Sequence, residues 1–363
     1  MKVMTLVGTR PEIIRLSRVI HLLDRTTDHT LVISGQNPDP LLSSIFIDEL
    51  GLRQPDHNLQ VDISTVGSVI AGVTMGVEEL ILRNRPDAFL ILGDTNSCLG
   101  AVIARRLGVP VFHHEAGNRC FDARVPEEIN RRIIDHTADY NLCYTEHALR
   151  NLSNEGLPGI ETTVVGSPLL EVLNHYRPLI VESQALVRLN LSKNSYILAS
   201  VHRAENVDNA ENLQKILESL QVVSRYYDQR LIVTAHPRLI RRLNEFNTFL
   251  RFDSSIEFIE PFGYFEYMQL QMNATCVISD SGSISEEAAM ARFPAVTIRE
   301  SMERPEALES GSILLTGLEP PAVLQGVIEM TNRYQNGDIP DSPEWYTVTA
   351  CASRTVDFIT SRS

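Results

Sequence analysis

The first stretch of the chain whose residue types could do chemistry is Gly8-Thr9-Arg10-Pro11-Glu12. Glycine lets the backbone turn tightly, and proline suits the first turn of a helix. A helix start offers unpaired backbone N–H groups and a positive dipole end, so Arg10 beside it would attract a phosphate. An ordinary surface turn that contains an arginine is the competing interpretation.

Two further stretches supply carboxylates. In Gly93-Asp94-Thr95, Asp94 either faces a ligand or caps a helix. Residues 113–119, His-His-Glu-Ala-Gly-Asn-Arg, precede Pro126-Glu127-Glu128-Ile129-Asn130-Arg131, where Glu127 and Arg131 share a helix face as in an ordinary ion pair. Carboxylates in a water-poor site can exchange protons near neutral pH, because burial raises their pKa. The two histidines and Glu115 do not predict a metal site, because successive side chains of a strand point to opposite faces.

The last two stretches lie in the second half of the chain. In residues 201–206, Val-His-Arg-Ala-Glu-Asn, His202 could trade a proton or donate to a phosphate near neutral pH. In residues 279–287, Ser281, Gly282 and Ser283 could offer N–H groups and hydroxyls to a diphosphate. Glu287, one turn into the next helix, could accept hydrogen bonds from both hydroxyls of a ribose. A plain helix cap is the alternative for this segment.

The elements that must position these stretches alternate between strands and helices. In the first half we expect strands at 3–7, 30–34, 88–92, 109–113, 141–144 and 163–165, and helices at 11–23, 66–84, 97–107 and 127–139. In the second half we expect strands at 196–200, 230–234, 256–259, 275–279 and 295–298, and helices at 210–227, from 239 and at 285–292. Each half therefore predicts an α/β domain with a parallel sheet, whose ligand lies at the carboxyl ends of the strands.

Length and composition set the limits of this interpretation. A chain of 363 residues suggests about two domains, and we place them at 1–167 and 168–347, with a last helix at 348–363 returning to the first. The net charge of −14 argues against a nucleic-acid binder. No apolar run is long enough to span a membrane, and we expect a cytoplasmic protein with no membrane partner. The odd number of cysteines, at no metal-ligand spacing, fits a reducing compartment: Cys98, Cys120, Cys143, Cys276 and Cys351.

Seven motifs, in order over nearly the whole chain, resemble those of the non-hydrolysing UDP-N-acetylglucosamine 2-epimerase family. They are Gly8-Thr9-Arg10-Pro11-Glu12, Gly93-Asp94-Thr95, His114-Glu115-Ala116-Gly117, Pro126-Glu127-Glu128-Ile129-Asn130-Arg131, His202-Arg203-Ala204-Glu205-Asn206, Asp280-Ser281-Gly282 and Glu303-Arg304-Pro305-Glu306. The resemblance implies two Rossmann-like doubly wound parallel-sheet domains of the glycosyltransferase-B-like type, with the active site in the interdomain cleft. It also implies a reaction without a cofactor or metal, and usually a homodimer.

Similar enzymes eliminate UDP to give a 2-acetamidoglycal and then add UDP back with carbon 2 inverted. A leaving diphosphate needs cations and N–H donors that bind its growing charge. By resemblance, the residues that bind the substrate or UDP are Arg10, Arg15, His202, Ser281, Gly282, Ser283, Glu287 and Arg304. By the same resemblance, the catalytic residues are Asp94, Glu115, Glu127, Arg131 and His202.

The chain departs from the family pattern at several positions. Arg15 replaces a usual lysine, Ser283 replaces a second glycine, and Gln36-Asn37 replaces the Gln-His of enzymes that their substrate activates. The segment 118–125 departs from the family's usual sequence, and the whole stretch from there through Thr137-Ala138-Asp139 resembles the branch that makes UDP-N-acetyl-L-fucosamine or its L-quinovosamine relative for bacterial surface polysaccharides such as O-antigen and capsule. We therefore expect a UDP-2-acetamido-2,6-dideoxy-L-hexose as substrate. The alternatives are UDP-N-acetylglucosamine as substrate, a hydrolysing epimerase, a glycosyltransferase of the same architecture and a nucleotide-sugar sensor.

Overall fold

The chain folds into two units, described here from a computed structural model of residues 1–36, 44–157, 161–246 and 254–362. Unit 1 comprises Met1–His175 with Glu344–Ser363, and unit 2 comprises Tyr176–Pro343. The division lies inside helix α7 (Leu169–Glu182), whereas we had placed it at residue 167, in the turn before that helix. Asn37, one of the positions that depart from the family pattern, lies outside the described residues.

Unit 1 is built on a seven-stranded parallel sheet with the strand order β3-β2-β1-β4-β5-β6-β7. Its strands are β1 (Lys2–Val7), β2 (Asp28–Ile33), β3 (His57–Asn58), β4 (Ala88–Leu92), β5 (Val111–Ala116), β6 (Tyr140–Cys143) and β7 (Thr162–Val164). Its helices are α1 (Arg10–Thr26), α2 (Ser44–Glu49), α3 (Val66–Asn84), α4 (Gly100–Arg106), α5 (Pro126–Thr137), α6 (Glu146–Asn154), the start of α7 and α16 (Cys351–Thr360). Helices cover both faces of this sheet, so β4 is buried along its whole length and is continuously apolar.

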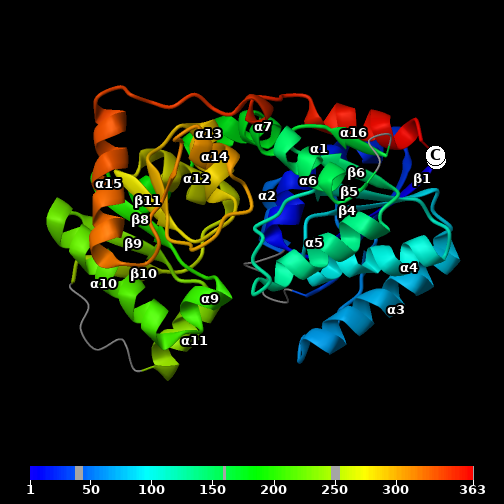
Figure 1. The fold of residues 1–363 in the computed structure, drawn as a ribbon, viewed down its shortest axis with the longest axis horizontal. Helices are drawn as coiled ribbons and strands as arrows, with labels where there is room; N and C mark the ends of the chain where they lie inside the picture. The colour runs from blue at the N-terminus through cyan, green and yellow to red at the C-terminus, as the bar shows by residue number, and fades with distance from the viewer. Residues whose placement is uncertain (37–43, 158–160, 247–253, 363) are drawn as a thin grey trace. The chain divides into compact units, whose positions relative to one another are not determined.

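Unit 2 repeats this arrangement on a six-stranded parallel sheet with the strand order β10-β9-β8-β11-β12-β13. Its strands are β8 (Tyr196–Ser200), β9 (Arg230–Thr234), β10 (Ile256–Ile259), β11 (Cys276–Ser279), β12 (Ala295–Thr297) and β13 (Leu314–Leu315). Its helices after α7 are α8 (Ala185–Arg188), α9 (Ala204–Val207), α10 (Ala210–Tyr227), α11 (Pro237–Glu245), α12 (Tyr264–Asn273), α13 (Ile284–Ala291), α14 (Glu306–Glu309) and α15 (Pro320–Gln335). Helices α10 and α15 pack side by side on this sheet (Figure 1). The prediction of two parallel-sheet α/β domains is confirmed.

Two predicted boundaries in unit 1 were wrong. Strand β5 runs to Ala116, so both neighbouring histidines and Glu115 belong to the strand, not to a loop after it. The apolar run from 109 led us to start the strand too early. We also ended it too early, because the polar residues at its end resemble loop residues although they are buried. The expected helix at 97–107 is a 3-10 turn at Asn96–Leu99 followed by α4.

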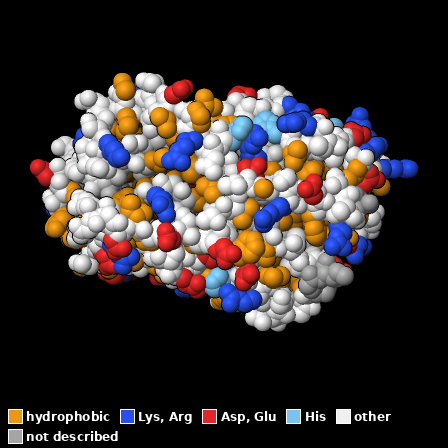
Figure 2. Space-filling view, turned by 90° about the horizontal axis from the view of Figure 1, so that it is seen from above, with side chains coloured by type: hydrophobic (Ala, Val, Ile, Leu, Met, Phe, Trp, Pro, Cys, Tyr) orange, Lys and Arg blue, Asp and Glu red, His pale blue; other side chains and the backbone are white. Residues whose placement is uncertain are grey.

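The last helix, α16, packs against α1 within unit 1 (Figure 1). The backbone N–H of Ala352, near the start of α16, donates to Glu171 in α7 over 2.9 Å. In the described part of the chain, no helix is both long and apolar enough to cross a membrane. On the face shown in Figure 2, acidic and basic side chains are interspersed among hydrophobic ones.

Candidate active site

In each unit the strand order reverses between two central strands, and the chemically unusual loops follow those strands. In unit 1 the reversal lies between β1 and β4, which lead into Gly8–Arg10 and Gly93–Thr95. In unit 2 it lies between β8 and β11, which lead into residues 201–203 and 280–283. Ligands of open parallel sheets bind beside such a reversal, at the carboxyl ends of the strands. Each unit therefore presents its candidate residues where its fold is best suited to bind a ligand.

Glu12, to which we had assigned no role, holds the loop after β1 in place. Its carboxylate accepts hydrogen bonds from the N–H of Gly8 over 2.6 Å and from the hydroxyl of Thr9 over 2.9 Å. Burial raises the pKa of the Glu12 carboxyl to about 7, although both of these hydrogen bonds lower it. The Thr-x-x-Glu spacing of a helix-capping box was the available signal. Arg10 begins α1 half-buried, with its guanidinium 5.7 Å from the centre of the Phe46 ring.

Asp94 forms an ion pair with Arg131 of α5. The Nε and Nη2 atoms of Arg131 lie 2.8 Å and 2.7 Å from the same Asp94 oxygen. The Nη1 of Arg131 donates to Glu128 over 2.9 Å, so the helix pair is made with Glu128 and not with Glu127. The pKa of Glu128 is lowered in spite of burial, because the N–H of Cys120 and Arg131 stabilise its charged form. In the described residues Glu127, which is half-buried, forms no ion pair.

Glu115, the residue before the last one of β5, has an unusual backbone conformation. Its φ of +69° lies in the left-handed region, which residues other than glycine rarely adopt, and the pairing with β6 shifts register there. The side chain is only 7% exposed and lies 3.7 Å from the Nε of Arg15, measured from its Oε2. Asn118 donates to its other oxygen over 3.3 Å. Strained residues of this kind cluster at functional sites, where the surrounding structure fixes them.

A buried network around Asp135 of α5 fixes the strand end that carries Glu115. Asp135 accepts from Arg119 over 2.6 Å, from the N–H of Gly117 over 3.2 Å and from His113 over 2.8 Å. The other nitrogen of His113 lies 2.8 Å from the carbonyl oxygen of Gly93. His113 thereby ties the loop of Asp94 to the strand of Glu115.

His114 points to the opposite face of β5, as expected for neighbouring residues of a strand. Its ring nitrogens lie 3.3 Å from the hydroxyl of Tyr144 and 3.0 Å from that of Thr355 in α16. Burial lowers the pKa of His114 to about 3, so the ring is neutral at physiological pH. The guanidinium of Arg15 lies 5.6 Å from the centre of the Tyr144 ring. Thr355 of α16 thus contacts His114, His114 contacts Tyr144, and the ring of Tyr144 lies against Arg15.

In unit 2, Asp280 organises the loop after β8. The fully buried carboxylate accepts from the N–H groups of His202 and Arg203, at 3.0 Å and 2.9 Å, and from the amide of Asn206 over 3.0 Å. Burial raises the pKa of Asp280, although these hydrogen bonds lower it. The ring of His202 stacks on His236, with 5.4 Å between ring centres. His202 is thus fixed on two sides and keeps about a quarter of its side chain exposed.

The turn after β11 is closed by a buried cluster of charges. Arg304 donates to the carbonyl oxygen of Gly282 over 3.0 Å and pairs with Glu303 and Glu286 at 3.1 Å and 3.0 Å. The N–H of Ser281 and of Ser283 donate within the turn, at 3.0 Å and 3.4 Å. The N–H of Gly282 has no partner among the described residues. This turn therefore offers an anion one unpaired backbone donor beside two serine hydroxyls.

The candidate residues of the sequence analysis are thus placed in two sets, one per unit. Unit 1 brings Asp94 together with Arg131, and Arg15 together with Glu115. Arg304, predicted to bind UDP, is 7% exposed and holds the turn of Gly282. Seven further residues support the two sets, and we had assigned a role to none of them, although four stand in the family motifs: Glu12, Glu128, Asp280 and Glu303 in the motifs, and Asp135, Gln271 and Glu286 outside them.

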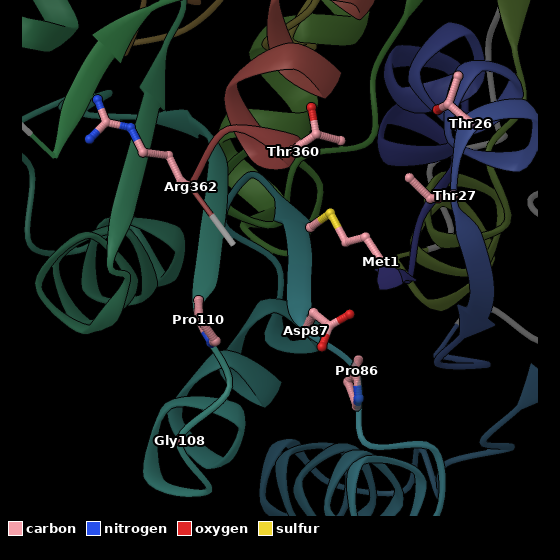
Figure 3. A pocket seen from close by; sticks show the side chains of 9 residues that line it. All are labelled: Met1, Thr26, Thr27, Pro86, Asp87, Gly108, Pro110, Thr360 and Arg362. Carbon is pink, nitrogen blue, oxygen red and sulfur yellow. The ribbon is translucent and has the colours of Figure 1, made fainter.

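A pocket of about 710 Å³ lies at the other end of the unit 1 sheet (Figure 3). Its lining residues Asp87 and Pro110 directly precede β4 and β5, so it opens at the amino ends of the strands. Ligands of parallel sheets bind at the carboxyl ends. The sticks in Figure 3 include the charged groups of Asp87 and Arg362, which the site described above does not use.

Comparisons with known proteins agree with this arrangement. The model of the family described as UDP-N-acetylglucosamine 2-epimerase matches residues 21–360. The UDP-N-acetylglucosamine 2-epimerase of Methanocaldococcus jannaschii is 37% identical, over 94% of this chain and 95% of its own length. The UDP-2,3-diacetamido-2,3-dideoxy-D-glucuronate 2-epimerase of Pseudomonas aeruginosa is 32% identical, over 99% of each chain.

Solved structures extend the similarity to the fold. The Methanocaldococcus jannaschii enzyme in complex with UDP-GlcNAc and UDP gives a TM-score of 0.94 at 35% identity, over 99% of this chain and 100% of that one. The UDP-N-acetylglucosamine 2-epimerase of Rickettsia bellii gives 0.91 at 40% identity, over 100% of this chain and 96% of that one. MurG of Acinetobacter baumannii, with 0.58 at 13% identity over 99% of each chain, shares the fold alone, which agrees with the expected glycosyltransferase-B-like architecture.

Proposed function

Because the chain belongs to the UDP-N-acetylglucosamine 2-epimerase family and is a UDP-sugar 2-epimerase, an isomerase, we propose that it works by detaching UDP and adding it back. A base removes the proton from carbon 2, the bond between carbon 1 and the UDP oxygen breaks, and a double bond forms between carbons 1 and 2. A proton then returns to the opposite face of carbon 2, and UDP re-forms its bond to carbon 1. The observation that carries this proposal is the placement of the family motifs at the strand-order reversal of each sheet.

The two residue sets have different tasks in this reaction. The unit 2 set, with the Gly282 turn, His202 and Glu287, holds UDP while it is detached. The unpaired N–H of Gly282 and the two serine hydroxyls suit the growing charge of a leaving diphosphate. The unit 1 carboxylates exchange the proton at carbon 2, and the nearby cations Arg15 and Arg131 keep them oriented.

We propose a UDP-2-acetamido-2,6-dideoxy-L-hexose as the substrate, that is, formation of UDP-N-acetyl-L-fucosamine or its L-quinovosamine relative. The segment 118–125 that motivates this choice begins three residues after Glu115, and its Asn118 donates to that carboxylate. Phe121 adds a ring that is 72% exposed, which suits the apolar methyl group of a 6-deoxy sugar. The Pseudomonas aeruginosa relative, named for a modified glucuronate, supports variation of the sugar within the family.

A substrate panel in deuterated water, followed by proton NMR, tests this proposal. We expect UDP-N-acetyl-L-fucosamine or its carbon 2 epimer to take up deuterium at carbon 2 and to reach an equilibrium of the two epimers. Rapid turnover of UDP-N-acetylglucosamine to UDP-N-acetylmannosamine would contradict the proposed substrate. It would favour the activity for which the Methanocaldococcus jannaschii relative is named. Stoichiometric release of free UDP would instead indicate a hydrolysing enzyme. Turnover that requires an added acceptor would indicate a glycosyltransferase.

We further propose that the enzyme is a homodimer that acts in the cytoplasm and supplies surface polysaccharide synthesis. Exposed apolar side chains on two helices of unit 1 support the dimer: Met75 and Leu82 on α3, and Ile129 and Ile133 on α5, each between 41% and 70% exposed. Within each helix the two side chains are seven or four residues apart and so share one face, and an exposed apolar helix face commonly marks a protein interface. Sedimentation of the purified protein as a monomer would contradict this assembly.

A further inference from the structure

The carboxylate of Glu287 is hydrogen-bonded to a buried glutamine, Gln271. Gln271 belongs to none of the family motifs and has no task in the proposed reaction. Gln271 lies in α12 and is fully buried. Its Nε2 donates to the Oε2 of Glu287 over 2.7 Å. Its own Oε1 is buried and has no partner among the described residues. A buried polar atom without a partner destabilises a fold, and an apolar side chain of the same size would fill this space without that cost.

The neighbouring glutamates of α13 differ in what holds them. Glu286 is fully buried and pairs with Arg304, so it belongs to the cluster that closes the Gly282 turn. Glu287 is half-buried, and in the described residues Gln271 is the only side chain that bonds its carboxylate. A glutamate has three rotatable bonds, so an unsupported Glu287 would sample several positions. The amide restrains one oxygen and leaves the other available for a ligand.

We propose that Gln271 is a positioning residue that holds the Glu287 carboxylate ready for the ribose of the UDP group. This inference rests on the proposed function, in which Glu287 accepts hydrogen bonds from the ribose hydroxyls. Orienting a carboxylate before the ligand binds removes the entropy cost of ordering it on binding. The energetic cost of the unpaired Oε1 of Gln271 is then offset by tighter binding of ribonucleotides.

The test compares the affinities of UDP and 2′-deoxy-UDP by calorimetry for wild type, Gln271→Met and Glu287→Gln. Wild type is expected to bind UDP about tenfold more tightly than 2′-deoxy-UDP. This difference in affinity corresponds to about one hydrogen bond to a charged group. Gln271→Met removes the donor with little change of volume, so we expect it to lose most of this preference while keeping the melting temperature of wild type. Glu287→Gln should lose the preference as well, and the double variant should lose no more than either single one.

Gln269→Met is the matched control. Gln269 lies in the same helix, is 6% exposed and donates to the carbonyl oxygens of Val181 and Ser183. Its replacement should lower the melting temperature and keep the preference for UDP. If Glu287→Gln loses the preference and Gln271→Met keeps it, the role of Gln271 is wrong and that of Glu287 stands. If Glu287→Gln also keeps it, the proposed ribose contact itself is wrong, and the inference fails with it.

Discussion

Asp94→Asn and Glu115→Gln are each expected to lower kcat by about 10²- to 10⁴-fold, the usual contribution of a general acid or base. Both substitutions keep the size of the side chain and remove its ability to hold and release a proton. Arg131 keeps its second partner, Glu128, when Asp94 is changed, so no buried charge is left alone. Glu115→Gln can still accept from Asn118. Initial rates of epimerisation measure the effect.

UDP affinity and a surface variant serve as controls for these two substitutions. In our account UDP is held by the unit 2 set together with Arg10, and neither substitution changes these residues, so UDP affinity should stay at the wild-type level in both variants. Asp62→Asn changes an exposed carboxylate of unit 1 that accepts hydrogen bonds from the N–H and the hydroxyl of Ser64 over 2.9 and 2.8 Å. This variant should leave kcat unchanged. A kcat of wild-type magnitude in both Asp94→Asn and Glu115→Gln would remove these carboxylates from the mechanism.

Gly282→Ala is expected to weaken UDP binding about 10- to 100-fold, which corresponds to about one or two hydrogen bonds of a charged group. A Cβ at this position would lie 2.4 Å from Glu303 Oε1, 2.9 Å from Arg304 Nη1 and 3.1 Å from Arg203 Nη2. Glu303 and Arg304 belong to the buried cluster that closes the turn, so either these side chains or the backbone must shift, and either change disturbs the turn that presents the N–H of Gly282. Titration with UDP measures the loss.

Gly67→Ala is a suitable control for this substitution. A Cβ at Gly67 meets nothing closer than the Thr65 hydroxyl at 3.8 Å, and alanine favours a helix more than glycine does. This variant should keep wild-type UDP affinity and at least wild-type stability. Unchanged UDP affinity in Gly282→Ala would contradict our view that this turn binds the diphosphate.

Much of the fold follows from local patterns in the chain. The strand Ala88–Leu92 was predicted at its observed bounds, because it is covered on both faces and reads as one apolar run. The bounds of strand β5 were predicted wrongly because its last residues are polar and nevertheless buried. A hydrophobicity pattern predicts that such polar residues are exposed. The polar end of β5 is stable because Asp135 and Thr355, distant in sequence, pair with it.

The sequence predicted the candidate site residues that belong to a motif. It did not predict which residues contact one another, because those contacts depend on the packing of distant elements. Asp94 and Arg131 were both singled out, but the ion pair between them depends on how α5 packs against β5 and the 3-10 turn at Asn96–Leu99. Glu128 looked equivalent to Glu127 in the sequence, and only the structure separates a buried glutamate from a half-buried one. Gln271 carried no signal, because a single glutamine belongs to no motif and its burial is visible only in the structure.

Positional isotope exchange tests the central claim, that UDP leaves the sugar and returns while bound. The UDP-sugar is prepared with ¹⁸O in the oxygen that joins carbon 1 to the β-phosphate, and its position is followed by phosphorus NMR during epimerisation. Detached UDP can rotate its terminal phosphate, so we expect the label to spread to the non-bridging oxygens as the epimer forms. Complete epimerisation with the label still in the bridging position would contradict the account.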